Sequence, residues 1–224
     1  MIESCNLGKC YRDESGDNWV IRGMELKIPK RRFTSIVGRS GSGKSTLLKM
    51  IGGLLVPDQG KVLIDGINIY EMTEKQMADY RCNKIGFVFQ DFLLEEMYTV
   101  YQNIEIVLMI SKFPPGLRKD MIVQALQAVG LGDRMKSPVK NLSGGEKQRV
   151  CIARAIVNKP QIIFADEPCG NLDWENGQII MKLLRDQVDQ GRNVVLVTHN
   201  REDAKLTDEI ITLQDGKILD YETL

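Results

Sequence analysis

The sequence predicts an α/β fold with a mostly parallel sheet, and three observations lead to this prediction. Strand-like apolar runs dominate the first and last thirds of the chain, whereas the middle third carries helical patterns. In the last third, IIFADE (162–167) and NVVLVTH (193–199) flank an apolar stripe with helical spacing. A glycine-rich loop, GRSGSGKST (38–46), joins a strand to a helix. Strands that alternate with helices favour a parallel sheet with sites at its carboxyl ends.

Short strands and turns make up the first third. Alternate apolar residues share one face of a strand: Met24, Leu26 and Ile28. The strand at 33–37 leads directly into the glycine-rich loop, and KVLIDGINI (61–69) bends at Asp65-Gly66. IGFVFQ (85–90) is a further buried strand that ends in a polar residue. These runs indicate a small sheet that carries the loop.

Helical signals dominate the middle third, where Thr99 and Gln102 have the spacing of a capping box. Two apolar stripes with helical spacing follow: Ile104, Val107 and Leu108, then Ile122, Leu126 and Val129. Gly130 ends the second stripe. Another helix joins the last two strands through four apolar residues: Ile180, Leu183, Leu184 and Val188.

The chain of 224 residues fits one large domain or a core with a small insert. We expect a single domain over residues 1–224. Its core comprises 1–90 and 158–224, and 91–157 form an inserted helical subdomain.

The charge balance argues against nucleic acid as a partner. Lys plus Arg (30) equals Asp plus Glu (30), which leaves no basic field to attract nucleic acid or anionic lipid. The longest apolar runs, such as 106–110 and 194–197, are far below the roughly 18 residues that span a bilayer. We therefore expect no direct membrane insertion, and membrane contact only through a protein partner. The polar N-terminus has no hydrophobic signal region, which favours a cytoplasmic protein.

The cysteines and the single histidine exclude several kinds of metal site and catalytic site. The five cysteines are odd in number and form no C-x-x-C, so neither a disulfide framework nor a zinc site is indicated. The single histidine, His199, excludes chemistry that needs two imidazoles.

The loop at 38–46 matches the phosphate-binding pattern G-x-x-x-x-G-K-[ST], with a strand before it and a helix after it. Its glycines let backbone N–H groups point at phosphate oxygens, and the helix N-terminus adds positive potential. We expect Lys44 to reach the β and γ phosphates and Ser45 to bind magnesium. A chance glycine-rich turn is the alternative. All nine residues are assigned to nucleotide binding: Gly38, Arg39, Ser40, Gly41, Ser42, Gly43, Lys44, Ser45 and Thr46.

Two adjacent carboxylates follow the buried strand IIFA at 162–165. Asp166 can hold magnesium through water, and Glu167 can orient or deprotonate an attacking water. A solvated loop is the alternative, and the phosphate-binding loop makes it the weaker one. The predicted cofactors are ATP and Mg²⁺.

A second Ser-Gly-Gly turn, in LSGGEKQR (142–149), also opens a helix, where N–H groups can receive an anion. A glycine turn without a ligand is the alternative. Together with GRSGSGKST and IIFADE, this stretch resembles the ATP-binding-cassette (ABC) family of ATPases over essentially the whole chain. The resemblance implies a P-loop NTPase (RecA-like) core, an N-terminal antiparallel β subdomain and an inserted α-helical subdomain.

The resemblance also implies roles for single residues. Tyr11 is expected to stack on adenine, although a surface aromatic is the alternative. Gln90 belongs to the Q-loop near magnesium, His199 contacts the γ phosphate, and Asp173 belongs to the D-loop GNLD (170–173). The expected catalytic residues are Glu167, His199 and Gln90, and the expected metal ligands are Ser45 and Gln90.

The same resemblance explains the second turn. Members of this family pair head to tail as homodimers, which implies that Ser143, Gly144 and Gly145 of one chain cover the γ phosphate held by Lys44 of the other. Each ATP would then lie between two chains.

Two segments, 87–108 and 165–177, are similar to the bacterial group of macrolide exporters, lipoprotein-releasing ATPases and antimicrobial-peptide-resistance transporters. This implies a cytoplasmic ATPase, peripheral on the inner face of the cell membrane, that drives a separate permease. Cys169 and Arg31-Arg32 depart from the group's usual pattern without touching the nucleotide chemistry. The alternatives are a non-transport ABC ATPase, a regulatory nucleotide-binding protein, and a small-molecule P-loop kinase, which leaves LSGGE and His199 unexplained.

Overall fold

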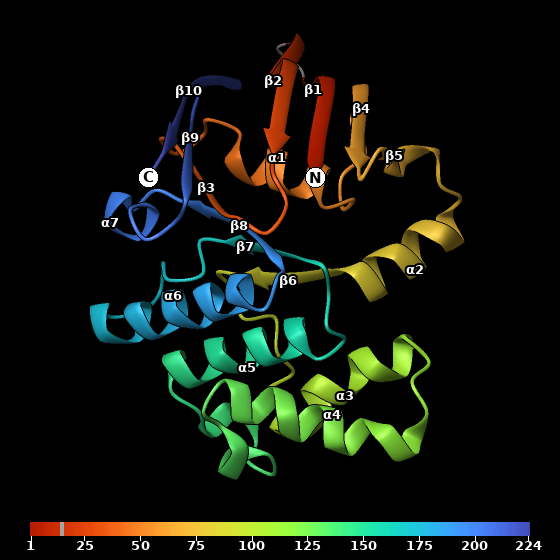
Figure 1. Cartoon of the computed structure of the whole chain (residues 1–224), viewed down its shortest axis with the longest axis vertical. Coiled ribbons are helices and arrows are strands. Elements are labelled where there is room, and N and C mark those ends of the chain that lie inside the picture. Colours follow the sequence, from red (N-terminus) through yellow and green to blue (C-terminus); the bar gives the residue numbers. More distant parts are fainter. Residues whose placement is uncertain (14–15) are drawn as a thin grey trace.

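The computed structural model describes residues 1–13 and 16–224 and contains two β-sheets (Figure 1). The strands of the first sheet are β1 (Ile2–Asp13), β2 (Gly16–Ile28), β4 (Gln59–Ile64) and β5 (Ile67–Asn68). They pair in the order β2-β1-β4-β5, antiparallel throughout. This sheet is the predicted antiparallel N-terminal part of the fold.

The second sheet is mostly parallel. Its strands are β3 (Phe33–Val37), β6 (Ile85–Phe89), β7 (Ile162–Asp166), β8 (Asn193–Thr198), β9 (Glu209–Gln214) and β10 (Lys217–Thr223). They pair in the order β10-β9-β3-β8-β7-β6, parallel from β9 to β6, with β10 antiparallel at the edge. The predicted α/β fold class is therefore confirmed.

The helices lie between and around the two sheets. They are α1 (Lys44–Ile51), α2 (Glu74–Lys84), α3 (Val100–Ile110), α4 (Pro115–Ala128), α5 (Gly144–Ile156), α6 (Trp174–Asp189) and α7 (Arg201–Ala204). Three single-turn 3-10 helices complete them: η1 (Ile69–Glu71), η2 (Gly132–Arg134) and η3 (Val139–Asn141). Helices α3 to α5 fall within 91–157, where helices were predicted. That these residues form a subdomain with those boundaries stays a prediction.

The central parallel strands β3, β8 and β7 of the second sheet are buried on both faces, which explains their continuous apolar runs. Along β7, Ile162 and Phe164 join one hydrophobic core with the first sheet and α1. Ile163 and Ala165 point the opposite way and join a second core with α3 to α6. Figure 1 shows the resulting layers, with α1 between the sheets and α3 to α5 on the far side of the second sheet.

Local signals set the helix ends. The predicted capping box at Thr99 and Gln102 is confirmed at the start of α3, and Gly130, with a φ of 69°, follows the end of α4. Capping boxes that the sequence analysis missed begin α2 at Thr73 and α5 at Ser143. In the described part of the chain, 1–13 and 16–224, no helix is long and apolar enough to cross a membrane.

Candidate nucleotide-binding site

The glycine-rich loop connects β3 to α1 at the carboxyl end of the parallel sheet. Gly43 caps α1 with a φ of 97°, a left-handed conformation that glycine adopts without strain. The loop folds around Lys44, whose Nζ donates hydrogen bonds to Gly38 O (2.8 Å) and Arg39 O (3.0 Å). Because the first N–H groups of a helix lack intrahelical acceptors, the start of α1 and the Lys44 ammonium together favour an anion here.

A cavity of about 660 Å³ opens in front of this loop. Ten residues line it: Val20, Ser40, Gly41, Gly43, Lys44, Ser45, Thr46, Gln90, Glu167 and His199. Nine of these were predicted site residues, contributed by the glycine-rich loop, α1 and the ends of β6, β7 and β8. The strand order brings them together, because β3 lies beside β8 and β8 beside β7.

Ser45 and Asp166 meet at the floor of the site. The Ser45 hydroxyl donates a hydrogen bond of 2.9 Å to Asp166 Oδ1. Burial raises the pKa of Asp166, although the hydrogen bond from Ser45 acts in the opposite direction. Ionising a carboxylate is costly when it is removed from water, and a cation bound beside it lowers that cost.

Glu167 and His199 follow the neighbouring strands β7 and β8, and their side chains contact each other at the cavity. Glu167 Oε2 lies 2.8 Å from His199 Nδ1 and also faces the backbone N–H of His199 at 3.4 Å. When Glu167 is ionised it accepts from Nδ1–H, which leaves Nε2 as the free nitrogen of the ring. Glu167 has a φ of 49°, an uncommon conformation for a residue other than glycine. Such strain at a strand end is typical of functional positions.

Gln90 follows β6 and lies in an exposed position at the cavity. Its side-chain Nε2 donates to Asn171 Oδ1 at 3.2 Å, and Asn171 Nδ2 donates back to Gln90 O at 3.4 Å. No group within residues 1–13 and 16–224 donates a hydrogen bond to the side-chain oxygen of Gln90, so this oxygen can act as a ligand. The Gln90 segment is thus tied to the GNLD loop at 170–173.

The residues present fit a hard cation such as Mg²⁺. The Ser45 hydroxyl, the Gln90 amide oxygen and the Asp166 carboxylate are oxygen donors, and Mg²⁺ prefers oxygen. No group of three or more His, Cys, Asp or Glu that could hold a metal occurs within 1–13 and 16–224. At a nucleotide, the remaining ligands of Mg²⁺ are usually phosphate oxygens and water.

Several predicted residues do not line this cavity. Tyr11 lies on β1 with 45% of its surface exposed. Asp173 caps α6 by accepting from Asn176 N at 2.8 Å, and this hydrogen bond holds its pKa below the ordinary value. Ser143 caps α5 by accepting from Glu146 N at 3.3 Å. Gly144 and Gly145 form the first turn of α5. Their roles toward a nucleotide stay predictions.

Two residues at the site were missed. Val20 lies on β2 and lines the cavity. Nothing in the sequence pattern of β2 distinguishes it from other apolar residues of that strand. Asn171 holds Gln90, and its place inside the GNLD loop was a usable signal.

A glycine-rich loop between strand and helix, with a partly buried aspartate at the end of a nearby parallel strand whose carboxylate accepts from the loop serine, defines a P-loop nucleoside triphosphatase. Comparison with known proteins identifies the family. The family model described as ABC transporter matches residues 21–170, so the chain belongs to the ABC transporter family.

Relatives and solved structures agree with this assignment. The chain is 39% identical over 220 residues to an ABC transporter ATP-binding protein, MJ1508, of Methanocaldococcus jannaschii, covering 98% of both chains. It is 40% identical to the macrolide export ATP-binding/permease protein MacB of Chlorobaculum tepidum, but spans only 34% of that protein. The dimeric structure of the ATP-binding cassette MJ0796, bound to ADP and Pi, superposes with a TM-score of 0.92 at 36% identity, covering 100% of this chain and 99% of that one.

These findings establish the class of activity. The chain is an ATP-binding subunit of the ABC transporter family and an ATPase. The resemblance stated from the sequence is confirmed.

Proposed function

We propose that two copies of this chain close head to tail around two ATP molecules with Mg²⁺, hydrolyse them, and drive a separate membrane permease. The observation that carries this proposal is the separation of two anion-binding turns. Lys44 lines the cavity, whereas Ser143 and Gly144 are exposed and are not among the residues that line it. The second turn is therefore free to serve a nucleotide held by another chain.

The dimeric state of a similar ATP-binding cassette supports this arrangement. MJ0796, which superposes on the whole chain, is described as a dimer in a post-hydrolysis state with ADP and Pi. In the proposed dimer, Ser143 O–H and the N–H groups of Gly144 and Gly145 donate to the γ phosphate of the partner's ATP. Asp173 and its D-loop lie at the junction of the two sites, and Tyr11 stacks on adenine in its own chain.

The polar residues in and beneath the cavity have distinct tasks in the proposed hydrolysis. Bound Mg²⁺ supplies positive charge at the β and γ phosphates. Ser45 and Gln90 would hold the ion, and Asp166 would do so through water. Lys44 leaves its two backbone carbonyls to neutralise phosphate oxygens. Glu167 orients and deprotonates the attacking water. His199 donates to the γ phosphate from Nε2–H in the imidazolium form, in which both ring nitrogens carry a proton and Nδ1–H still faces Glu167.

The permease partner is supported by the relatives of the exporter type. In MacB, an ATP-binding part and a permease are joined in one protein, as its name states, and this chain matches about a third of that length. A separate permease of this type would place the chain at the inner face of a membrane. Export, lipoprotein release and peptide resistance are the proposed tasks of such an assembly.

A mixing experiment tests the shared site. Lys44→Ala removes the phosphate charge, and Ser143→Arg places a bulky side chain where the γ phosphate should be covered. Both homodimers are expected to be nearly inactive. Random mixing makes about half the dimers mixed, and each of these has one intact site, so about a quarter of wild-type ATP turnover should return if the sites act independently.

Recovery on mixing supports the shared site, and one further measurement can contradict it. If both residues served a nucleotide within one chain, mixing would restore nothing, because every chain carries its own defect. Strong coupling between the sites also suppresses recovery, so the decisive measurement is Ser143→Arg alone. Turnover at the wild-type rate in that variant would show that the LSGGE turn does not cover the nucleotide.

A further inference from the structure

The turn at the start of α5 carries a negative charge of its own. Glu146 is the third residue of the helix, and its carboxylate Oε2 accepts a hydrogen bond of 2.9 Å from Ser143 N–H. Only 18% of this side chain is exposed. In the proposed dimer a γ phosphate would approach the same turn, so the carboxylate and the phosphate would repel each other.

One cation lies against this carboxylate. Arg134, the last residue of η2, places Nε 3.3 Å from Glu146 Oε1. Both carboxylate oxygens are thus engaged: Oε2 accepts from Ser143 N–H, and Oε1 forms an ion pair with the Arg134 guanidinium. The hydrogen bond from Ser143, with smaller contributions from Arg134 and Arg149, holds the pKa of Glu146 below its ordinary value.

Two other cations of the same helix are engaged elsewhere. Arg149 Nη1 donates to Val129 O at 3.5 Å, at the C-terminal end of α4. Lys147 forms an ion pair with Glu96 at 2.8 Å. Among the ion pairs of the described residues, Arg134 is the one cation that contacts Glu146.

We propose that Arg134 is a positioning residue of the LSGGE turn, which neutralises Glu146 and so keeps the start of α5 attractive to the γ phosphate of the partner's ATP. This inference rests on the proposed function and assigns a charge-setting role to a residue outside the motif. Glu146 stabilises the turn through its capping box, but its negative charge disfavours a phosphate at the same helix N-terminus. Arg134 cancels that charge without occupying the donors on Ser143, Gly144 and Gly145.

The test is a double-mutant cycle on the KM for ATP of the full chain. Arg134→Gln leaves Glu146 uncompensated and should raise KM roughly two- to fivefold, the size of a charge effect at a helix terminus. Glu146→Gln keeps the capping box, because glutamine accepts the same hydrogen bond, and should show a KM no higher than wild type. In the Glu146→Gln background, Arg134→Gln should then have no further effect.

Salt and conservative replacement separate charge from shape. The KM increase caused by Arg134→Gln should shrink between 0.05 and 0.5 M NaCl, since the screening length falls from about 14 Å to about 4 Å over this range. Arg134→Lys should restore a KM within about twofold of wild type, because it keeps the charge. The matched control is Lys136→Gln, which removes an exposed cation nearby in the chain and should leave KM unchanged.

Three outcomes would overturn the inference. They are an Arg134→Gln defect that persists in the Glu146→Gln background, a defect that does not respond to salt, and an equal defect in Lys136→Gln. The thermal unfolding midpoint of each variant is recorded, and a loss of folded protein would lower kcat per chain without producing the expected KM pattern. If Ser143→Arg is inactive while the cycle is additive, only this inference fails. If Ser143→Arg is fully active, the proposed function fails with it.

Discussion

Glu167 combines three features that set it apart among the carboxylates of residues 1–13 and 16–224. It follows a buried strand, it has a positive φ of 49°, and it contacts His199 Nδ1 at 2.8 Å. A water held between this carboxylate and a γ phosphate would lose its proton to Glu167. We therefore expect the rate of hydrolysis to be most sensitive to changes in Glu167 and His199, at the ends of β7 and β8.

Replacing Glu167 by glutamine should slow hydrolysis while preserving ATP binding. The amide keeps the size of the side chain but cannot act as a base, so turnover should fall by roughly 10²-fold or more. Steady-state ATPase assays and equilibrium binding of ATP measure the two properties separately. Glu222→Gln, an exposed position on β10, is the control. Turnover within a few-fold of wild type would exclude Glu167 as the base.

Two cysteines are expected to resist alkylation in the folded protein. Burial raises the pKa of Cys151 and of Cys169 to about 12, so both thiols stay protonated near neutral pH. Since the thiolate is the reactive form, labelling by iodoacetamide at pH 8 should be on the order of 10²-fold slower at these positions in the native protein than in urea. Mass spectrometry of the labelled peptides reads this out. Equal rates in both states would contradict the burial that the structure assigns.

At the scale of elements, α5 packs close to α6, and this contact constrains the second glycine of LSGGE but not the first. A Cβ on Gly145 would lie 2.1 Å from Asn176 Oδ1, whereas a Cβ on Gly144 would have no neighbour closer than 3.7 Å. Asn176 in turn donates to both carboxylate oxygens of Asp173, at 3.0 and 2.9 Å. The second glycine is therefore required by packing, and it brings the LSGGE turn against the D-loop.

Gly145→Ala should accordingly lower the free energy of unfolding by about 1–3 kcal/mol, as overpacking does, and Gly144→Ala should leave it within about 1 kcal/mol of wild type. Urea denaturation of both variants measures the difference. Asn176→Ala should recover part of the loss in Gly145→Ala, because it removes the clashing oxygen. A Gly145→Ala variant as stable as Gly144→Ala would show that α5 and α6 lie farther apart.

Helix α5 also holds the segment that carries Gln90. Gln148 Nε2 donates to Phe89 O at 3.2 Å, Cys151 Sγ donates to Phe92 O at 3.0 Å, and Arg154 donates to Phe92 O at 3.0 Å and Leu93 O at 2.5 Å. These donors recur on one face of the helix and satisfy the carbonyl of the last residue of β6 and two carbonyls of the irregular segment that follows it. The backbone around Gln90 is thereby fixed, while nearby side chains are free to face outward.

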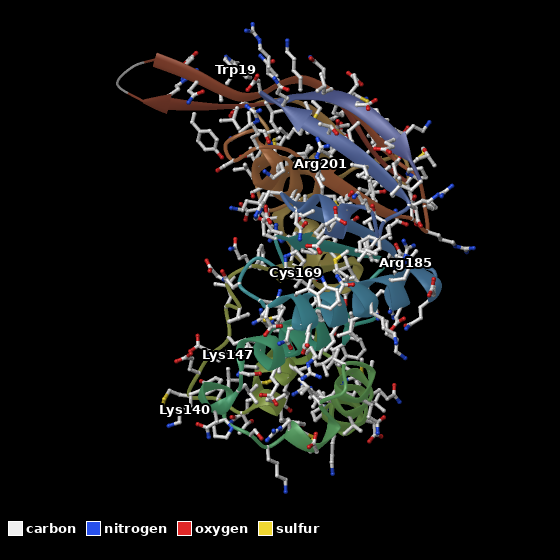
Figure 2. All side chains as sticks on the ribbon, turned by 90° about the vertical axis from the view of Figure 1, so that its left-hand side faces the viewer. Trp19, Lys140, Lys147, Cys169, Arg185 and Arg201 are labelled. Atoms are coloured by element: carbon white, nitrogen blue, oxygen red, sulfur yellow. The ribbon has the colours of Figure 1, made fainter. Side chains whose placement is uncertain are left out.

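At the scale of the whole molecule, the helical side presents exposed apolar residues beside this anchored segment. Leu93 and Met97 are 64% and 78% exposed, whereas Leu94 packs on the core. Figure 2 shows Lys140 and Lys147 at this end of the molecule, opposite the end that carries Trp19. An exposed apolar surface close to the nucleotide site is where a permease would sense ATP.

Leu93→Ser and Met97→Ser should therefore reduce stimulation of the ATPase by its permease severalfold, without changing ATP binding by the isolated chain. The side chains are exposed, so their loss should not disturb the fold. ATP turnover in proteoliposomes, with and without the permease, measures coupling. Leu219→Ser, at a position 67% exposed on β10, is the control. If ATP binding is lost instead, these residues belong to the nucleotide site.

Much of the candidate site was predictable because its signals are local. The phosphate-binding loop is a continuous stretch whose pattern requires a strand before it and a helix after it, and both were visible in the sequence. Period-two alternation predicted the buried face of β2, and the capping box at Thr99 predicted the start of α3. In each case the residues that cooperate are neighbours along the chain.

The remaining features depend on which elements lie side by side, and only the tertiary structure decides that. The order β3-β8-β7 brings Glu167 against His199 and both toward Lys44, although helices separate these strands in the sequence. The contacts of Gly145 with Asn176 and of Arg134 with Glu146 arise in the same way. The sequence by itself determined the chemistry of the phosphate loop, the carboxylates and the LSGGE turn, because short motifs encode it. Packing between distant segments decided how these parts are oriented, since side-chain contacts across elements leave no periodic trace in the chain.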